Sequence, residues 1–278
     1  MTENFELVKN GKVKDIYVYD KDHLLFNFSD RVSVYDVILP DKIPDKGEIL
    51  CKFAEYWFNK LDFPNHMIKL HDKSRMVVKK LNMIPMECIV RGYLYGGLFE
   101  KAKKGDVKLD APLILASKLD SPMFDPTTKS DIRDMPVDRD EAINSNLVTP
   151  EEFDTLKKIS VDLYNKMHEI LLDAGFIIAD IKFEFGKDAD GNILLADSIG
   201  PDEFRLWSAD KYEVGQTQES FDKQLIRDWV TDNGWREKLE LYIKDKSPEH
   251  LPVLPSDLIQ QVSDRYKVAY QRTSGNSI

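Results

Sequence analysis

The chain has 278 residues, of which 42% are hydrophobic and 32% are charged, and its formal net charge is −10. This composition is typical of a soluble globular protein; no apolar run approaches the roughly 18 residues of a membrane span, and the acidic balance argues against non-specific binding to nucleic acid. We therefore expect neither a membrane nor a nucleic-acid partner. The two cysteines form no close motif and favour a reducing cytoplasm, where the chain is expected to be a monomer or a small homo-oligomer.

Residues 5 to about 82 are predicted to form mostly short strands, because runs rich in β-branched and aromatic residues alternate with turn signals. Asn10 and Gly11 mark a hairpin turn. The segment "KGEILCKFAEYWFNKLD" is predicted to be the one good helix of this region, since Ile49 and Phe53 recur at helical spacing.

The longest helix is predicted in the second half of the chain. Thr149 and Glu152 form a capping box at its start, and an apolar stripe at helical spacing marks its buried side. Gly175 is expected to end this helix. Two shorter helices are predicted around 219–232 and 256–271.

The stretch 117–138 is polar and rich in proline, and we expect it to be a long irregular loop of the kind that is often functional. Together the elements predict an α+β protein. A β-rich N-terminal lobe, 1–82, is expected beside a larger mixed α/β lobe, 83–278, with a ligand in a cleft between them.

The strand "IADIKFEFG", residues 178–186, alternates apolar and charged side chains. Its apolar face is ordinary core, whereas Asp180, Lys182 and Glu184 share the other face. Such a face either is solvated or lines a charged site, and the residues of this strand alone leave both interpretations open.

The residues that follow favour a charged site. Asp190 and Gly191 indicate a two-residue hairpin loop, which places Glu184 opposite Asp197 on the returning strand. Carboxylates in opposed positions repel and destabilise a sheet. A divalent cation removes that penalty, and hard cations such as Mg²⁺ prefer carboxylate oxygens, so the sequence predicts a magnesium and phosphate site.

Basic residues at three places suggest anion binding. Lys12 and Lys14 follow a glycine turn and share a strand face that could cover a polyphosphate, although a solvated hairpin explains them as well. Arg91 precedes a glycine-containing stretch and suits either a phosphate or a structural ion pair. Arg205, just past Asp202, follows the carboxylate strands and suits a second anion.

Two further stretches give weaker signals. Met83 and Met86 could border a flat ring, or they could belong to a buried connecting strand. Lys129, Asp131 and Asp134 crowd into the long polar loop, where charged residues are usually only solvated. Neither stretch decides a function by itself.

Taken together, these stretches resemble the SAICAR synthetase (phosphoribosylaminoimidazole-succinocarboxamide synthase) family over nearly the whole chain. "GKVKDIY" is similar to the family's N-terminal phosphate hairpin and "MIPMECIVRGYLYGG" to its first signature, while "IADIKFEFG" matches its second signature. "FDPTTKSD" and "SFDKQLIRDW" resemble the longer form of the family, which occurs in yeasts and some bacteria.

The resemblance implies an ATP-dependent carbon–nitrogen ligase of purine biosynthesis. ATP would phosphorylate the carboxylate of carboxyaminoimidazole ribonucleotide, and L-aspartate would attack the acyl phosphate to give SAICAR, ADP and phosphate. ATP and Mg²⁺ are the implied cofactors, with ATP in the cleft between the two lobes. The implied roles are catalysis for Lys129, Asp180 and Lys182; ATP binding for Lys12, Lys14, Met83, Met86, Glu184 and Asp197; Mg²⁺ binding for Glu184 and Asp197; and substrate binding for Arg91, Gly97, Asp131, Asp134, Asp202 and Arg205.

Three positions depart from the family pattern. Gly97 stands where a serine is usual, so that a backbone amide would replace a hydroxyl at the substrate phosphate. Ser198 stands where a glutamate commonly follows the metal aspartate, and Asp125 where the longer form often has threonine. None of the three is a member of the Glu184–Asp197 pair.

Other function classes are open from the residues. Asp-x-Lys strands also occur in inositol-phosphate-type kinases, in which a hydroxyl would accept the phosphoryl group and aspartate would play no part. A protein kinase is disfavoured, because neither a His-Arg-Asp nor an Asp-Phe-Gly motif occurs. A non-enzymatic nucleotide sensor is disfavoured by the number of charged groups that converge.

Overall fold

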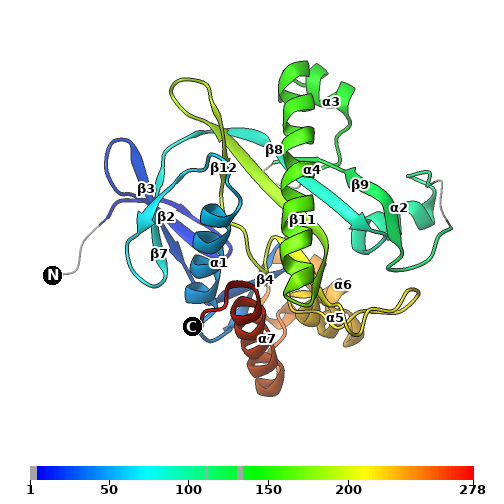
Figure 1. The fold of residues 1–278 in the computed structure, drawn as a ribbon. Helices are drawn as coiled ribbons and strands as arrows, with labels where there is room; N and C mark the ends of the chain where they lie inside the picture. The colour runs from blue at the N-terminus through cyan, green and yellow to red at the C-terminus, as the bar shows by residue number, and fades with distance from the viewer. Residues whose placement is uncertain (1–4, 110–111, 130–133) are drawn as a thin grey trace. The chain divides into compact units, whose positions relative to one another are not determined.

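The computed structural model describes residues 5–109, 112–129 and 134–278 (Figure 1). Strands and helices form a mixed α/β arrangement, which confirms the predicted fold class. Contacts divide the chain into two compact units. The first consists of Met1–Lys80, Ile199–Asp202 and Phe221–Ile278, and the second of Leu81–Ser198 and Glu203–Ser220.

The first unit contains a five-stranded antiparallel sheet with the order β1-β2-β3-β7-β6. The predicted hairpin at Asn10 is confirmed, because Asn10 pairs with Asp15 and the amide of Gly11 donates to the carbonyl of Lys14 at 3.0 Å. A separate antiparallel pair, β4 and β5, follows β3. The strands are β1 (Leu7–Asn10), β2 (Lys14–Val18), β3 (His23–Phe28), β4 (Arg31–Val34), β5 (Val37–Lys42), β6 (Met67–Leu70) and β7 (Arg75–Lys79).

Helices complete the first unit. The predicted N-terminal helix is α1 (Lys46–Lys60), and α7 (Ser256–Ser274) packs on it where the rings of Phe53 and Tyr270 meet edge to face at 5.3 Å. This apolar contact explains why 221–278 groups with the N-terminal residues rather than with the rest of the predicted 83–278 lobe.

The C-terminal helices differ from their predicted ranges. Helix α5 (Gln224–Asp232) begins later than expected. Helix α6 (Trp235–Asp245) was not predicted, because it buries only Leu239 and so lacks a long apolar stripe. A short 3₁₀ turn, Pro248–His250, precedes α7. Among the described helices, none is long and apolar enough to cross a membrane.

The second unit is built on a six-stranded sheet in which β8 and β11 are the central neighbours. The prediction of a wholly irregular 117–138 is wrong, because β9 and β10 lie within it and both pair with β8. Phe124 opposes Val90 in this pairing, and its ring packs on Phe153 at 5.6 Å. The strands are β8 (Asn82–Tyr93), β9 (Lys118–Phe124), β10 (Thr127–Thr128), β11 (Phe176–Lys187), β12 (Ile193–Ala196) and β13 (Phe204–Ser208).

Helix α4 (Pro150–Asp173) covers one face of this sheet (Figure 1). The predicted capping box between Thr149 and Glu152 is present at its start. Inside the contact, the hydroxyl of Tyr164 donates to the carbonyl of Ile178 at 2.8 Å. A Cβ atom at Gly92 would lie 1.7 Å from that hydroxyl, so the position beneath Tyr164 requires glycine. The other helices of this unit are α2 (Gly96–Lys104) and α3 (Arg139–Asn144).

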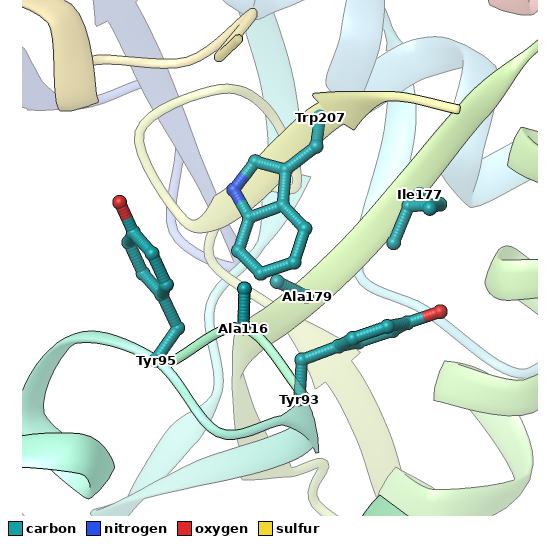
Figure 2. Close-up of a cluster of buried hydrophobic side chains, with 6 residues drawn as sticks. All are labelled: Tyr93, Tyr95, Ala116, Ile177, Ala179 and Trp207. Carbon is teal, nitrogen blue, oxygen red and sulfur yellow. The ribbon is translucent and has the colours of Figure 1, made fainter. Parts of the chain in front are cut away.

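An aromatic cluster fixes the end of β8 and the start of α2 (Figure 2). The ring of Trp207, on β13, meets Tyr95 at 5.0 Å and Tyr93 at 5.4 Å, in both cases edge to face. Aromatic pairs of this kind stabilise a fold beyond the apolar area that they bury. The cluster therefore holds the first turn of α2 beside β13. Its members are Tyr93, Tyr95, Ala116, Ile177, Ala179 and Trp207.

Candidate active site

The charged face of β11 lies inside the second unit. Asp180 and Glu184 are only 6% and 4% exposed, and β11 has β8 along one edge and β12 and β13 along the other. A solvated strand would expose these carboxylates, so that interpretation is wrong. Buried charges are costly unless they are paired or hydrogen-bonded, and the pairing therefore determines what this face can do.

The predicted pairing of Glu184 with Asp197 is wrong by one residue. Glu184 faces Ala196 across β11 and β12, and the same register continues along the hairpin. Asp197 lies just beyond the end of β12, with a positive φ of 61°. The two carboxylates therefore do not occupy opposed positions of one ladder.

The loop between β11 and β12 explains this shift. The carboxylate of Asp188 accepts hydrogen bonds from the amides of Asp190 at 3.0 Å and Asn192 at 2.9 Å, while Gly191 has a φ of 84°. The amide of Asp188 also donates to the carbonyl of Asn192, so that three residues rather than two form the loop. An odd loop length moves every cross-strand partner by one.

The carboxylate opposite Glu184 is Glu87, on β8, which the sequence analysis missed. Both side chains are buried, and Lys182 joins them, with Nζ 2.7 Å from Glu87 Oε1 and 3.2 Å from Glu184 Oε1. Lys129 pairs with the other oxygen of Glu184, and Thr127 donates to Glu87 at 3.1 Å. The available signal was a lone glutamate in the apolar run "MIPMECIV".

Both lysines of this cluster are held in the charged form. Burial lowers the pKa of Lys182, but the carboxylates of Glu184 and Glu87 outweigh that effect and raise it well above its ordinary value. Burial likewise lowers the pKa of Lys129, but the carboxylates of Glu184 and Asp197 outweigh that effect and raise it above its ordinary value. The two ammonium groups therefore suit the binding of anionic oxygens rather than general-base catalysis.

A second charged cluster crosses three adjacent strands. Asp180 pairs in register with Arg91 of β8 on one side and with Arg205 of β13 on the other. Arg205 Nη1 lies 2.6 Å from Asp180 Oδ2, and Arg91 Nη1 lies 3.6 Å from the same oxygen. Arg91 Nε also donates to Asp125 at 2.6 Å, and Lys101 approaches Asp125 at 3.0 Å. The structural ion pair expected as one alternative for Arg91 is thus present.

The start of α2 lies against these guanidinium groups. A Cβ atom at Gly96, where φ is 53°, would lie 2.7 Å from Arg205 Nη2, and one at Gly97 would lie 3.9 Å from Arg91 Nη2. The guanidinium of Arg205 also lies 6.0 Å from the centre of the Tyr95 ring. A helix N-terminus beside two guanidinium groups is a favourable place for an anion.

The predicted phosphate lysines do not share a strand face. Lys12 lies in the turn before β2 and its exposed ammonium pairs with Asp36. Lys14 is the first residue of β2 and is buried, with Nζ 4.9 Å from the centre of the Phe26 ring and 5.7 Å from that of Phe28. Lys12 belongs to the connection between β1, which ends at Asn10, and β2, which begins at Lys14, so it has no place on a strand face.

Other predicted site residues fall in different environments. Met86 is fully buried in the core whereas Met83 is 41% exposed, because residues three apart on β8 face opposite sides. The two methionine side chains therefore do not lie together on one side of a flat ring, as the sequence had suggested. Asp134 is half-buried, and Asp131 lies outside the described residues.

Asp202 differs most from its predicted role. It belongs to the first unit, where its buried carboxylate lies 2.7 Å from Lys46 Nζ and 3.2 Å from the hydroxyl of Tyr266. Arg205 belongs to the second unit. Asp202 therefore forms a buried structural ion pair, whereas Arg205, three residues later, has a partly exposed guanidinium. The predicted substrate-binding role of Asp202 is corrected to that of a core residue.

The predicted magnesium ion would be held by few protein ligands. Among the described residues, no group of three or more His, Cys, Asp or Glu side chains is arranged to hold a metal ion. Mg²⁺, however, usually keeps several waters and binds one or two carboxylates together with substrate phosphates. Glu184 and Asp197 both raise the pKa of Lys129 and of Lys182, which places the two carboxylates near the same pair of ammonium groups. These hard oxygen donors therefore fit a magnesium site shared with phosphates.

Sequence comparison identifies relatives over almost the full length. The family model of SAICAR synthetase matches residues 7–242. The phosphoribosylaminoimidazole-succinocarboxamide synthase of Nitrosopumilus maritimus is 50% identical over 276 residues, which are 98% of this chain and 100% of that protein. The enzyme of the same name from Corynebacterium urealyticum is 39% identical, over 98% of this chain and 94% of its own.

Solved structures agree with the sequence relatives. A SAICAR synthase from Saccharomyces cerevisiae in complex with SAICAR has a TM-score of 0.84 and 32% identity, and the match covers 99% of this chain and 96% of that one. A SAICAR synthetase in complex with ADP has a TM-score of 0.75 and 25% identity, with coverage of 98% and 99%. The chain therefore belongs to the SAICAR synthetase family of ATP-dependent ligases.

Proposed function

We propose that the protein joins L-aspartate to the carboxylate of carboxyaminoimidazole ribonucleotide and releases SAICAR, ADP and phosphate, with ATP as the phosphoryl donor. The yeast relative in complex with SAICAR and the related synthetase in complex with ADP support this assignment. The observation that carries it is the pair of charged clusters centred on Asp180 and on Lys182 with Glu184, which lie along one face of β11.

The first cluster suits the phosphate of the ribonucleotide. Arg91 and Arg205 provide guanidinium groups, and the α2 N-terminus provides the amide of Gly97 in place of the serine hydroxyl usual in the family. Asp180 orients both guanidinium groups. The phosphate would therefore bind at one end of the charged face, and the imidazole and its carboxylate would extend along β11 toward Lys182.

The second cluster suits the reacting carboxylate. A carboxylate is a poor electrophile, and transfer of the γ-phosphoryl group to one of its oxygens gives an acyl phosphate with a good leaving group. The amine of L-aspartate then forms the C–N bond and loses a proton, while the C–O bond to phosphate breaks. Lys129 and Lys182 are charged, so they can hold the anionic oxygens in place as this happens.

We assign Mg²⁺ and ATP by the same reasoning. Glu184 and Asp197 would hold the cation together with the ATP phosphates, and the cation would neutralise phosphate charge. Lys12 and Lys14 are assigned to the ATP phosphates. Lys12 is exposed in its turn, and the pairing of its ammonium with Asp36 is a surface ion pair that a polyphosphate can replace.

The dependence of ADP release on two further substrates tests the proposed function. ADP release is expected to require both carboxyaminoimidazole ribonucleotide and L-aspartate, and the product is expected to contain the new amide. A small-molecule kinase of the inositol-phosphate type would instead release ADP with a hydroxyl acceptor and would ignore aspartate. ADP release that is independent of aspartate would therefore reject the ligase assignment.

Arg205→Ala is expected to weaken binding of the ribonucleotide by one to two decades and to leave ATP binding unchanged. The loss of a charge-assisted contact typically costs about 1.5–3 kcal/mol, which corresponds to that range of affinity. Calorimetric titration of each ligand measures the effect. Arg139→Ala is the matched control, because Arg139 forms an exposed ion pair with Asp154 at 2.9 Å. Equal losses for both ligands would contradict the placement.

A further inference from the structure

The turn between β1 and β2 is held from one side by a single arginine. Arg31, the first residue of β4, donates from Nη2 to the carbonyl of Gly11 at 2.9 Å and from Nε to the carbonyl of Lys12 at 3.4 Å. Two successive carbonyl groups of the turn therefore point toward one guanidinium. The sequence pattern around Arg31 indicates no role for it, because its contacts are to a turn that lies about twenty residues earlier.

The guanidinium is itself fixed. It forms a bidentate ion pair with Asp15, with Nη1–Oδ2 and Nη2–Oδ1 distances of 3.1 and 2.7 Å. The side chains are 23% and 10% exposed, so solvent screens this pair only partly. The backbone of Arg31 is held as well, since its carbonyl accepts from Lys46 Nζ at 3.0 Å.

Arg31 has a consequence for the amide groups of the turn. In a trans peptide the carbonyl and the following N–H point in opposite directions. Because the carbonyls of Gly11 and Lys12 face Arg31, the amides of Lys12 and Val13 face away from it. Within the described part of the chain, neither amide has a hydrogen-bond acceptor. Successive outward amides are a common way to bind phosphate oxygens.

We propose that Arg31 is a positioning residue for ATP, which acts by holding the Gly11–Lys14 turn so that the amides of Lys12 and Val13 face the polyphosphate. The inference rests on the proposed ATP-binding role of this turn. Arg31 does not touch the nucleotide in this scheme. Its charge is neutralised by Asp15, and its function lies in the orientation of backbone groups.

Arg31→Lys and Arg31→Gln are expected to raise the KM for ATP about tenfold or more, while kcat at saturating ATP and the KM for L-aspartate stay near wild-type values. Lysine should not rescue, because an ammonium cannot make the forked contacts to Asp15 and two carbonyl groups at once. A merely structural role predicts a lower active fraction, hence a lower kcat with unchanged KM values. An unchanged KM for ATP in both variants would overturn the inference.

Arg75→Gln is the matched control. Arg75 lies on β7 of the same unit and pairs with Asp72 at 2.6 Å, so its loss removes an arginine–aspartate pair without touching the turn. If Arg31→Gln fails to fold, Asp15→Asn tests the same positioning role, since it weakens the bidentate ion pair that orients Arg31. Thermal unfolding identifies the folded variants, and Asp15→Asn is expected to raise the KM for ATP but not that for L-aspartate; an unchanged KM for ATP counts against the inference.

Lys12→Ala separates the inference from the function on which it rests. If Lys12→Ala leaves the KM for ATP unchanged, the ATP-binding role of the turn fails. If Lys12→Ala raises that KM and Arg31→Lys does not, only the positioning role of Arg31 fails. When both hold, the double variant is expected to lose less than the product of the two single effects, because both changes act on the same turn.

Discussion

Replacing Lys182 with methionine is expected to lower the free energy of unfolding by about 2–3 kcal/mol and to reduce turnover by orders of magnitude. Lys182 lies between Glu87 and Glu184, which oppose each other across β8 and β11. Loss of one partner from a buried ion pair typically costs about 3–5 kcal/mol. The lysine side chain is 30% exposed, so solvent screening reduces that cost.

Denaturant unfolding and ADP release measured on the same samples check this prediction. The double variant Lys182→Met/Glu87→Gln should regain part of the stability, because one of the opposed charges is gone, and should stay inactive. The folded-state pKa of Lys182 is raised, so its contribution is complete below the ordinary value of 10.5 and is lost only as the pH rises through the higher folded value. The stability difference should therefore be constant around neutral pH. A Lys182→Met variant as stable as wild type would contradict the pairing.

Lys46→Met is expected to destabilise the first unit by about 3–5 kcal/mol. Lys46 is fully buried and its partner Asp202 has a side chain only 3% exposed, so the substitution leaves a carboxylate without its ammonium in the core. The hydroxyl of Tyr266 remains at 3.2 Å but carries no charge, and Lys223, whose charge also acts on Asp202, compensates for only part of the loss. A single substitution of this size removes a large fraction of the stability of a typical domain.

The matched control is Lys73→Met, because Lys73 forms an exposed pair with Glu48 at 2.8 Å that solvent screens and that should contribute little to stability. Acid adds a second readout. Burial raises the pKa of Asp202, but Lys223 and Lys46 outweigh it and the folded value is lowered. Stability from this group is thus present above the unfolded pKa and lost as the pH falls. Because Lys223 remains, Lys46→Met should reduce that acid dependence rather than abolish it, and a wild-type acid profile would argue against the pair.

Features set by neighbouring residues were predicted well. The capping box of Thr149 and Glu152, the apolar stripe of α1 and the hairpin at Asn10 all depend on contacts within a few positions. The loop length predicted for the hairpin after β11 was wrong, and the reason is also local. The side chain of Asp188 accepts hydrogen bonds from the amides of Asp190, in the loop, and Asn192, just after it, which favours a loop of three residues. The sequence "KDADGN" contained this competing signal beside Asp-Gly.

Pairings between distant segments were not predictable in the same way. Nothing near Glu184 in the sequence indicates that Glu87 faces it, because the β8–β11 register depends on the packing of the whole second unit. Asp202 was placed with Arg205 from sequence proximity, yet the backbone directs Asp202 to Lys46. Lys129, Lys182 and Glu184 were predicted as site residues, whereas Glu87 and the ion pairs that these residues form came only from the structure.

The pairing of β8 with β11 also bears on how the chain acquires activity during synthesis. Helices α2, α3 and α4 lie between the two strands in sequence, so closing this sheet requires a long loop and is expected to be slow. Strand β8 leaves the ribosome well before β11, and its apolar run "CIV" then lacks the central neighbour that covers one edge. Until β11 arrives, Glu87 has no Lys182 and Arg91 has no Asp180. Although β9 and β10 can already pair with β8, an incomplete nascent chain therefore exposes one unpaired edge of β8 that is prone to aggregate. It gains both charged clusters together when β11 joins the sheet.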